Sequence, residues 1–157
     1  RTSQTALIHA SKLGHVTSVS ALVKAGAIVD IQATDAYMTA LMMAVQDEVV
    51  PSIVALRRCG ASFDLETKSG LTALIWATTN GKIRSIEVLA KLGANVAFET
   101  RNGTTAVIEA IKSRQRPAIH ALYEAGAMRW ADHETVAHQT ALIVASENGL
   151  VDFVLDL

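Results

Sequence analysis

The sequence predicts an all-α fold, a solenoid of stacked helix-turn-helix units joined by short β-hairpin loops. The tripeptide Thr-Ala-Leu or Thr-Ala-Val recurs every 33 to 35 residues, and a Gly-Ala pair follows its first four copies by 21 or 22 residues. An [Ile/Val]-x-x-Leu pair lies between these two marks in every unit. A fixed period of this length indicates a repeat architecture. The chain is therefore interpreted as one array over residues 1–157, with repeats at about 1–33, 34–66, 67–99, 100–134 and a partial fifth at 135–157.

Each tripeptide is expected to open a short first helix. A threonine before an apolar run accepts a backbone N–H of the first turn, as N-cap residues do. Alanines stand at the first and fifth positions after each threonine, and residues four apart share one helix face. That face allows a neighbouring helix to approach closely, while the next Leu or Val fills the space between layers. The threonines are Thr5, Thr39, Thr72, Thr105 and Thr140, and the space-filling residues are Leu7, Leu41, Leu74, Val107 and Leu142.

A glycine, which adopts positive φ freely, ends the first helix in three units. Glu48 and Arg114 take its place in the second and fourth units, which leaves the geometry of those two turns open. A proline follows each of them and can still start the second helix. The glycines are Gly14, Gly81 and Gly149, and the prolines are Pro51 and Pro117.

One unit alone has too little core to offset a backbone entropy of about 1–2 kcal/mol per residue, so it must stack on its copies. The ten to twelve residues from each Gly-Ala pair to the next threonine include turn-like stretches such as Thr67-Lys68-Ser69-Gly70. These segments are expected to project as hairpins.

The repeated residues resemble the ankyrin repeat, over four full units and part of a fifth. The unit that opens at Thr72 is most similar to the family pattern, with Gly70, Gly81, Gly93 and Asn95 in their usual places. All five units depart from it, with Ala in place of the family's Pro and an aliphatic residue or Met in place of its His. The first unit meets the pattern Gly-x-Thr-Pro-Leu-His-x-Ala-Ala-x-x-Gly-His with Gln4-Thr5-Ala6-Leu7-Ile8-His9-Ala10-Ser11-Lys12-Leu13-Gly14-His15.

The resemblance implies a non-catalytic module that binds a protein or peptide through its concave side, which hairpins and inner helices line. Its alternative is a targeting or regulatory segment of a multidomain enzyme, such as a kinase. Further repeats or domains are expected in the full-length chain, since the sequence stops inside the fifth unit.

Composition disfavours several other classes of partner. With 14 Lys+Arg against 15 Asp+Glu, the chain lacks the basic excess that binding to nucleic acid requires. Its longest apolar run, Ala40 to Val45, is far shorter than the roughly 20 residues of a membrane span, so membrane insertion is not expected. A single cysteine, Cys59, forms no internal disulfide, which favours an intracellular and cytoplasmic location.

No residue is assigned to catalysis, to a cofactor or to a metal. The nearest candidate is His133-Glu134-Thr135-Val136-Ala137-His138, which is one residue longer than the zinc-binding His-Glu-x-x-His. Histidines five apart diverge on a helix, so exposed loop histidines are the favoured interpretation and a small metallohydrolase the alternative.

Large apolar groups at expected surface positions predict the anchors of a partner. Tyr37 and Met38 stand where a turn glycine and a small polar residue are usual, and Leu71 follows in the next unit. Trp130 is a fourth anchor or else folds back onto the stack, and Trp76 is expected in the core. Replacing Met38 and Leu71 by Asp should then abolish capture without unfolding. The predicted partner-binding residues are Asp35, Tyr37, Met38, Gln46, Asp47, Lys68, Leu71, Asn80, Arg101, Asn102, Lys112 and Trp130.

Overall fold

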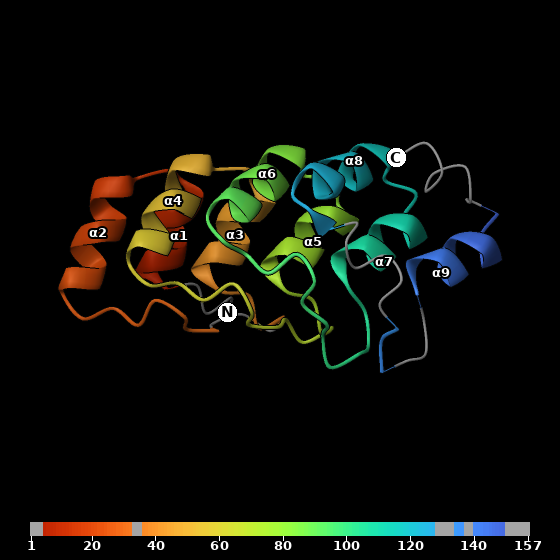
Figure 1. Cartoon of the computed structure of the whole chain (residues 1–157). Coiled ribbons are helices and arrows are strands. Elements are labelled where there is room, and N and C mark those ends of the chain that lie inside the picture. Colours follow the sequence, from red (N-terminus) through yellow and green to blue (C-terminus); the bar gives the residue numbers. More distant parts are fainter. Residues whose placement is uncertain (1–4, 33–35, 128–133, 137–139, 150–157) are drawn as a thin grey trace.

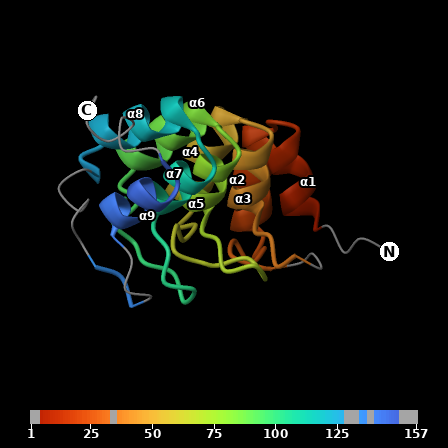
Figure 2. The same ribbon diagram turned by 90° about the vertical axis from the view of Figure 1, so that its right-hand side faces the viewer.

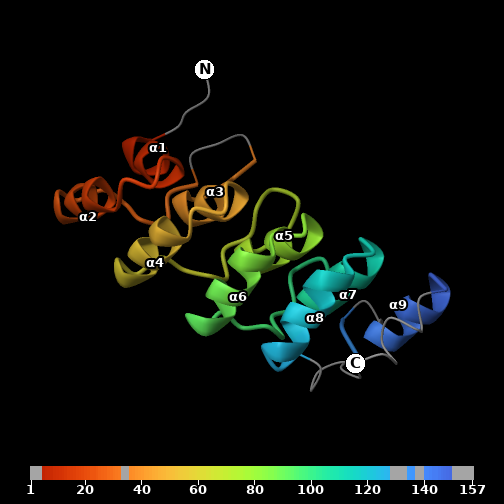
Figure 3. The same cartoon turned by 90° about the horizontal axis from the view of Figure 1, so that it is seen from above.

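The helices form two rows that run along the length of the molecule (Figures 1 and 3). The computed structural model describes residues 5–32, 36–127, 134–136 and 140–149, and within these ranges it has nine α-helices and no strand. The inner row holds the first helix of each unit and the outer row holds the second. The inner helices are α1 (Ala6–Lys12), α3 (Ala40–Gln46), α5 (Ala73–Thr79), α7 (Ala106–Lys112) and α9 (Ala141–Glu147); the outer helices are α2 (Val16–Lys24), α4 (Val50–Arg58), α6 (Ile83–Lys91) and α8 (Arg116–Glu124).

Each helix from α1 to α8 contacts the other helix of its unit, and all nine described helices contact a neighbouring helix of their own row. The chain thus stacks unit on unit, and Figure 2 shows the loops that join them gathered below the helices. This arrangement confirms the predicted all-α repeat solenoid. No helix in the described ranges combines the length and the apolar character that crossing a membrane would require.

All five threonines cap the inner helices as predicted. Each hydroxyl oxygen accepts the backbone N–H of the third helical residue, at 3.2 Å for Thr5, 3.3 Å for Thr39, 3.4 Å for Thr72 and Thr105, and 3.1 Å for Thr140. The bond satisfies one of the backbone donors that a helix start leaves without a partner.

The residue that follows the C-cap of each inner helix has a positive φ in all five units. Gly14, Gly81 and Gly149 have φ of 75°, 63° and 64°, and Glu48 and Arg114 have φ of 51° and 54°. The two turns without glycine are therefore not rearranged. They place an ordinary side chain in a left-handed conformation, which costs roughly 1–2 kcal/mol at each site. Pro51 and Pro117 stand in the first turn of α4 and α8, as predicted.

The core lies between the rows and between successive units. The paired alanines of α3, α5, α7 and α9 are at most 3% exposed, and the apolar pairs of α4, α6 and α8 are likewise buried. Trp76 packs against this core, as predicted.

The two ends of the described stack differ from its middle. Ala6 on α1 is exposed because no described inner helix precedes it. The expectation that Leu142 fills a layer was wrong, since it is 42% exposed on α9, whose inner-row neighbour in the described ranges is α7 alone. Burial of a repeated side chain thus depends on having a unit on both sides.

Candidate interaction surface

Four loops project from the inner row and form what we call the finger row. Finger 1 comprises the described parts of 27–38, finger 2 is 61–71, finger 3 is 94–104 and finger 4 is described at 134–136. A backbone bond closes finger 2, from Thr67 N to the Leu71 carbonyl at 2.9 Å, and an equivalent bond closes finger 3, from Thr100 N to the Thr104 carbonyl at 3.0 Å. The hairpins predicted for fingers 2 and 3 are therefore present as tight turns, without strand pairing in the described residues.

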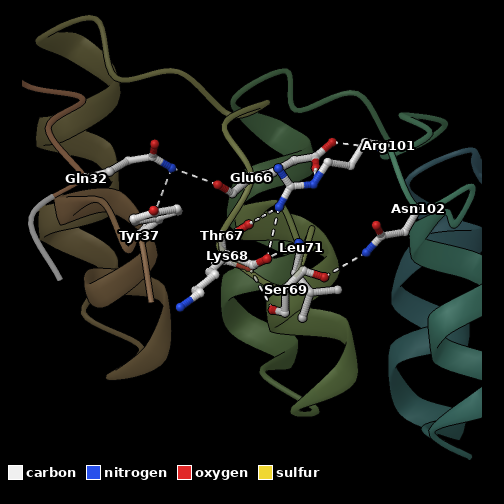
Figure 4. Close-up of polar contacts among 9 residues, drawn as sticks. All are labelled: Gln32, Tyr37, Glu66, Thr67, Lys68, Ser69, Leu71, Arg101 and Asn102. Carbon is white, nitrogen blue, oxygen red and sulfur yellow. Dashed lines mark hydrogen bonds and ion pairs between the residues drawn. The ribbon is translucent and has the colours of Figure 1, made fainter. Parts of the chain in front are cut away.

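Fingers 2 and 3 are joined by Glu66 and Arg101 (Figure 4). The Glu66 carboxylate accepts the Arg101 backbone N–H at 2.9 Å and pairs with Arg101 Nε at 3.1 Å. The same guanidinium donates through Nη2 to the carbonyls of Thr67 and Lys68, at 3.1 and 3.0 Å. Arg101 therefore binds three groups of the preceding finger, although its side chain is 58% exposed.

Asn102 adds a second link between the same fingers. Its Nδ2 donates to the Ser69 carbonyl at 2.8 Å (Figure 4). This bond holds the amide close to Gly70. A Cβ at Gly70 would collide with that amide, and Gly70 has φ of 79°. Glycine is thus favoured here by its backbone conformation, and a larger residue would displace the Asn102 amide from this contact.

Fingers 1 and 2 are joined by backbone acceptors and a glutamine. Gln32 Nε2 donates to the Glu66 carbonyl at 2.7 Å and to the Tyr37 carbonyl at 3.0 Å. Lys68 N donates to the Ala36 carbonyl at 2.9 Å. Nearer the helices, the Asp30 carboxylate accepts Ser62 N at 3.0 Å. A bond from Val136 N to Glu99 Oε1, at 2.6 Å, connects finger 4 to finger 3.

Of the predicted anchors, Met38 is buried, contrary to the expectation, and Leu71 is half-buried. Met38 is 7% exposed and belongs to the core, and Leu71 packs partly buried against it. Both directly precede an N-cap threonine, and an apolar residue there packs against the fourth helical residue, as a hydrophobic staple. Those fourth residues are Met43 and Trp76, both in or against the core. In the fourth unit the same two positions hydrogen-bond instead, from Thr104 Oγ1 to Glu109 Oε1 at 2.9 Å.

Tyr37 is the most exposed of the three predicted anchors that the structure describes. It is 49% exposed, and its φ of 57° places it in the left-handed region where Gly70 and Gly103 stand in the next two fingers. A bulky residue in that conformation is strained, and such strain concentrates at functional sites. The Gln32 bond to its carbonyl holds the turn in place.

The remaining predicted residues lie at the ends of the inner helices and on the fingers. Asp47 pairs with Lys12 at 3.9 Å, so it links the first two units. Lys112 pairs with Glu109 of its own helix at 3.8 Å, and Asn80 Nδ2 donates to the Trp76 carbonyl at 2.8 Å. Gln46 is half-buried and Lys68 is exposed. Asp35 and Trp130 lie outside the described residues.

Sequence reasoning missed the acceptors that hold the finger row together. Glu66 and Glu99 each accept a backbone N–H from the following finger, and Gln32 stands one period earlier. These three residues are spaced by 34 and 33 positions, so the repeat register itself carried a signal. Arg101 and Asn102, predicted as partner contacts, are engaged in the same links.

The described residues contain no cluster of three or more His, Cys, Asp or Glu side chains that would hold a metal ion. Glu134 is exposed, whereas His133 and His138 of the metallohydrolase alternative lie outside the description.

Stacked helix pairs, threonine caps and a row of turn-like fingers define a repeat protein of the helical solenoid class. The family models for ankyrin repeats match the chain over residues 41–129, as three copies, and over residues 3–36, as one further repeat. The chain belongs to the ankyrin-repeat family, whose members are in general non-catalytic protein-interaction modules. No curated protein matches it.

Proposed function

We propose that this chain is a non-catalytic scaffold or adaptor, working inside the cell, that binds one protein or peptide partner through its finger row and the adjoining ends of the inner helices. The observation that carries the proposal is Tyr37, a large side chain kept exposed at a strained turn where the neighbouring fingers have glycine. Tyrosine is enriched among the residues that dominate interface energies, because it contributes a large contact area at low entropic cost.

The links between fingers support this proposal. An interface made of independently mobile loops loses free energy when the loops become ordered on binding. Here Arg101, Asn102 and Gln32 already fix fingers 1 to 3 relative to one another. A partner therefore meets a preorganised surface, and more of the contact energy contributes to affinity.

The residues proposed to contact the partner therefore differ from those expected from the sequence. Tyr37 is the apolar anchor and Lys68 supplies a nearby cation, while the inner-helix ends add Gln46, Asp47, Asn80 and Lys112. This surface combines one aromatic group with charges of both signs, so its partner is expected to have mixed polarity.

Replacement of Tyr37 by glycine tests the proposal. Tyr37→Gly restores the residue that the turn geometry favours, so the folded state should be at least as stable as the parent. The amount of partner protein that the variant captures should nevertheless fall about tenfold, because a central aromatic contact is lost. The readout is quantitative affinity capture, followed by the dissociation constant of each purified captured protein.

Tyr123→Ala is the matched control, since Tyr123 is 40% exposed but lies on α8 in the outer row. Capture by this variant should equal capture by the parent. Equal capture by Tyr37→Gly and the parent would reject the finger row as the binding surface.

A further inference from the structure

A recessed surface lies between α6 and α8, which are neighbouring helices of the outer row. Figure 1 shows these two helices on the opposite side of the inner row from the loops that form the fingers. It is a groove of about 730 Å³ with a floor of small and apolar residues. Ile83 and Pro117 line it at the first turns of the two helices, and Ala90, Ala121 and Ala125 line it further along. The two helices occupy the same place in successive units, so they run in the same direction along its length.

The side chains that line the groove differ from those at the same register between α4 and α6. Shifted by one period, the positions of Ala90, Ala121 and Ala125 are those of Arg57, Val88 and Leu92, between α4 and α6. Val88 and Leu92 pack against the core, and the Arg57 guanidinium lies 4.5 Å from the centroid of the Phe63 ring. The same register is thus filled by long side chains in one place and reduced to methyl groups in the next.

The charges of the groove also differ from those of its neighbour. Glu87, Glu124 and Lys91 line it, and these two acids and one base give a formal charge of −1 with His120 neutral. None of the three ionised groups forms an ion pair within the described residues. The corresponding positions between α4 and α6 hold Arg57, Arg58 and Arg84, together with Glu87 and Lys91, which also line the groove between α6 and α8; their formal charge is +3.

We propose that the groove between α6 and α8 is a docking site for an amphipathic helix of a partner protein that carries Lys or Arg beside its apolar face. An apolar side chain of that helix packs on Ile83, Pro117 and Ala121. A basic side chain one or two turns further on reaches Glu87 and Glu124. The carboxylates and the nearby carboxyl ends of both outer helices favour a cation.

The dimensions favour a helix as the occupant. Helices of nine residues give a groove roughly 13 Å long, which matches two to three turns of a third helix. Apolar anchors at i and i+4 suit such a groove, as in other helix-in-groove complexes. The basic surface between α4 and α6 repels the same helix. The helix therefore binds between α6 and α8 in preference to the space between α4 and α6.

A displayed library of amphipathic helical peptides tests this proposal. Peptides are selected on the parent chain and counter-selected on Ala121→Val with Ala125→Leu, which copies the residues that the preceding unit has at these positions. Enriched peptides should combine aliphatic or aromatic residues at i and i+4 with Lys or Arg on the same face. The probe for all measurements is then one enriched peptide, with affinity measured by fluorescence anisotropy.

Filling the groove should weaken binding of that peptide by about tenfold or more. Glu87→Gln with Glu124→Gln should weaken it about three- to tenfold and reduce its dependence on salt. The matched control is Ala21→Val with Ala25→Leu, which makes the same changes at the same register of α2. This control should leave affinity unchanged, as should Tyr37→Gly, which tests the finger surface separately.

Three results would overturn the proposal. One is equal enrichment of peptides on the parent and on the filled variant. Another is selection of acidic rather than basic helices. The third is an affinity that neither the filling nor the glutamine substitutions alter while circular dichroism shows all variants folded. None of these results bears on the function proposed for the fingers.

Discussion

The helix rows and the finger row follow the same 33-residue period but are stabilised by different interactions. In the helix rows, side chains such as Ile53, Ile86 and Leu89 have no exposed surface, and burial of apolar area supplies the stability. In the finger row, side-chain donors and acceptors bind backbone groups of the next finger, with Arg101 still 58% exposed. The rows therefore determine whether the chain folds, whereas the fingers determine how one surface is ordered.

The two regions also differ in how strictly they repeat. The threonine cap is identical in all five units, because each inner helix has the same unsatisfied donors. The links between fingers differ, with glutamine joining the first two fingers and arginine with asparagine the next two. Positions that solve a shared packing problem are thus constant, and positions on the fingers are individual, as a specific binding surface requires.

The sharpest test of this comparison is a pair of neighbouring substitutions. Met38→Asp places a carboxylate in the core and should lower the free energy of unfolding by roughly 3–5 kcal/mol. Tyr37→Asp, one residue earlier and half exposed, should change it by less than about 1 kcal/mol, because Asp tolerates the left-handed conformation. Urea unfolding followed by circular dichroism measures both. Similar losses for the two variants would contradict the assignment of Met38 to the core and Tyr37 to the surface.

A smaller effect is expected for the finger links. Glu66→Ala removes the acceptor of the Arg101 backbone N–H and should lower stability by only about 1 kcal/mol, because water reaches the freed groups. Exchange of the Arg101 amide hydrogen should nevertheless rise about tenfold, since its hydrogen bond is lost.

Glu99→Ala is the matched control for the finger links, because Glu99 occupies the same register and accepts Val136 N. It should accelerate exchange at Val136 and leave Arg101 protected. Unchanged protection of Arg101 in Glu66→Ala would show that the fingers are ordered by something other than these side chains.

Most of the helical architecture could be predicted from the sequence. Thr-Ala-Leu and [Ile/Val]-x-x-Leu report local requirements, namely a cap and a buried stripe, and identical requirements recur at one period. The exposed surface was harder to predict because exposure depends on contacts between units. Met38 and Leu71 look like surface residues in a loop, yet the cap that follows each of them turns the side chain toward the core.

The contacts of the candidate site were hard to predict for the same reason, because they too depend on how the units stack. Arg101 and Asn102 stand where a partner contact is expected, but the distance from finger to finger allows them to bind Thr67, Lys68 and Ser69 instead. That distance is set by stacking and is not visible in the sequence. The groove between α6 and α8 could have been noticed from Ala90, Ala121 and Ala125, once the neighbouring unit showed what normally fills those positions.

The smallest expected effect concerns the turns between the two rows, where Glu48 and Arg114 replace the glycine of the other units. Glu48→Gly should raise the free energy of unfolding by roughly 0.5–1 kcal/mol, because relief of the left-handed strain exceeds the entropy that glycine adds to the unfolded chain. Gly149→Ala makes the reverse change at the same register, where a Cβ has open space, and should cost a similar amount. If urea unfolding gives free-energy changes of opposite sign for these two variants, the left-handed backbone conformation accounts for the preference for glycine at this position. A loss of stability in Glu48→Gly would mean instead that the Glu48 side chain stabilises the turn by more than its strained φ costs.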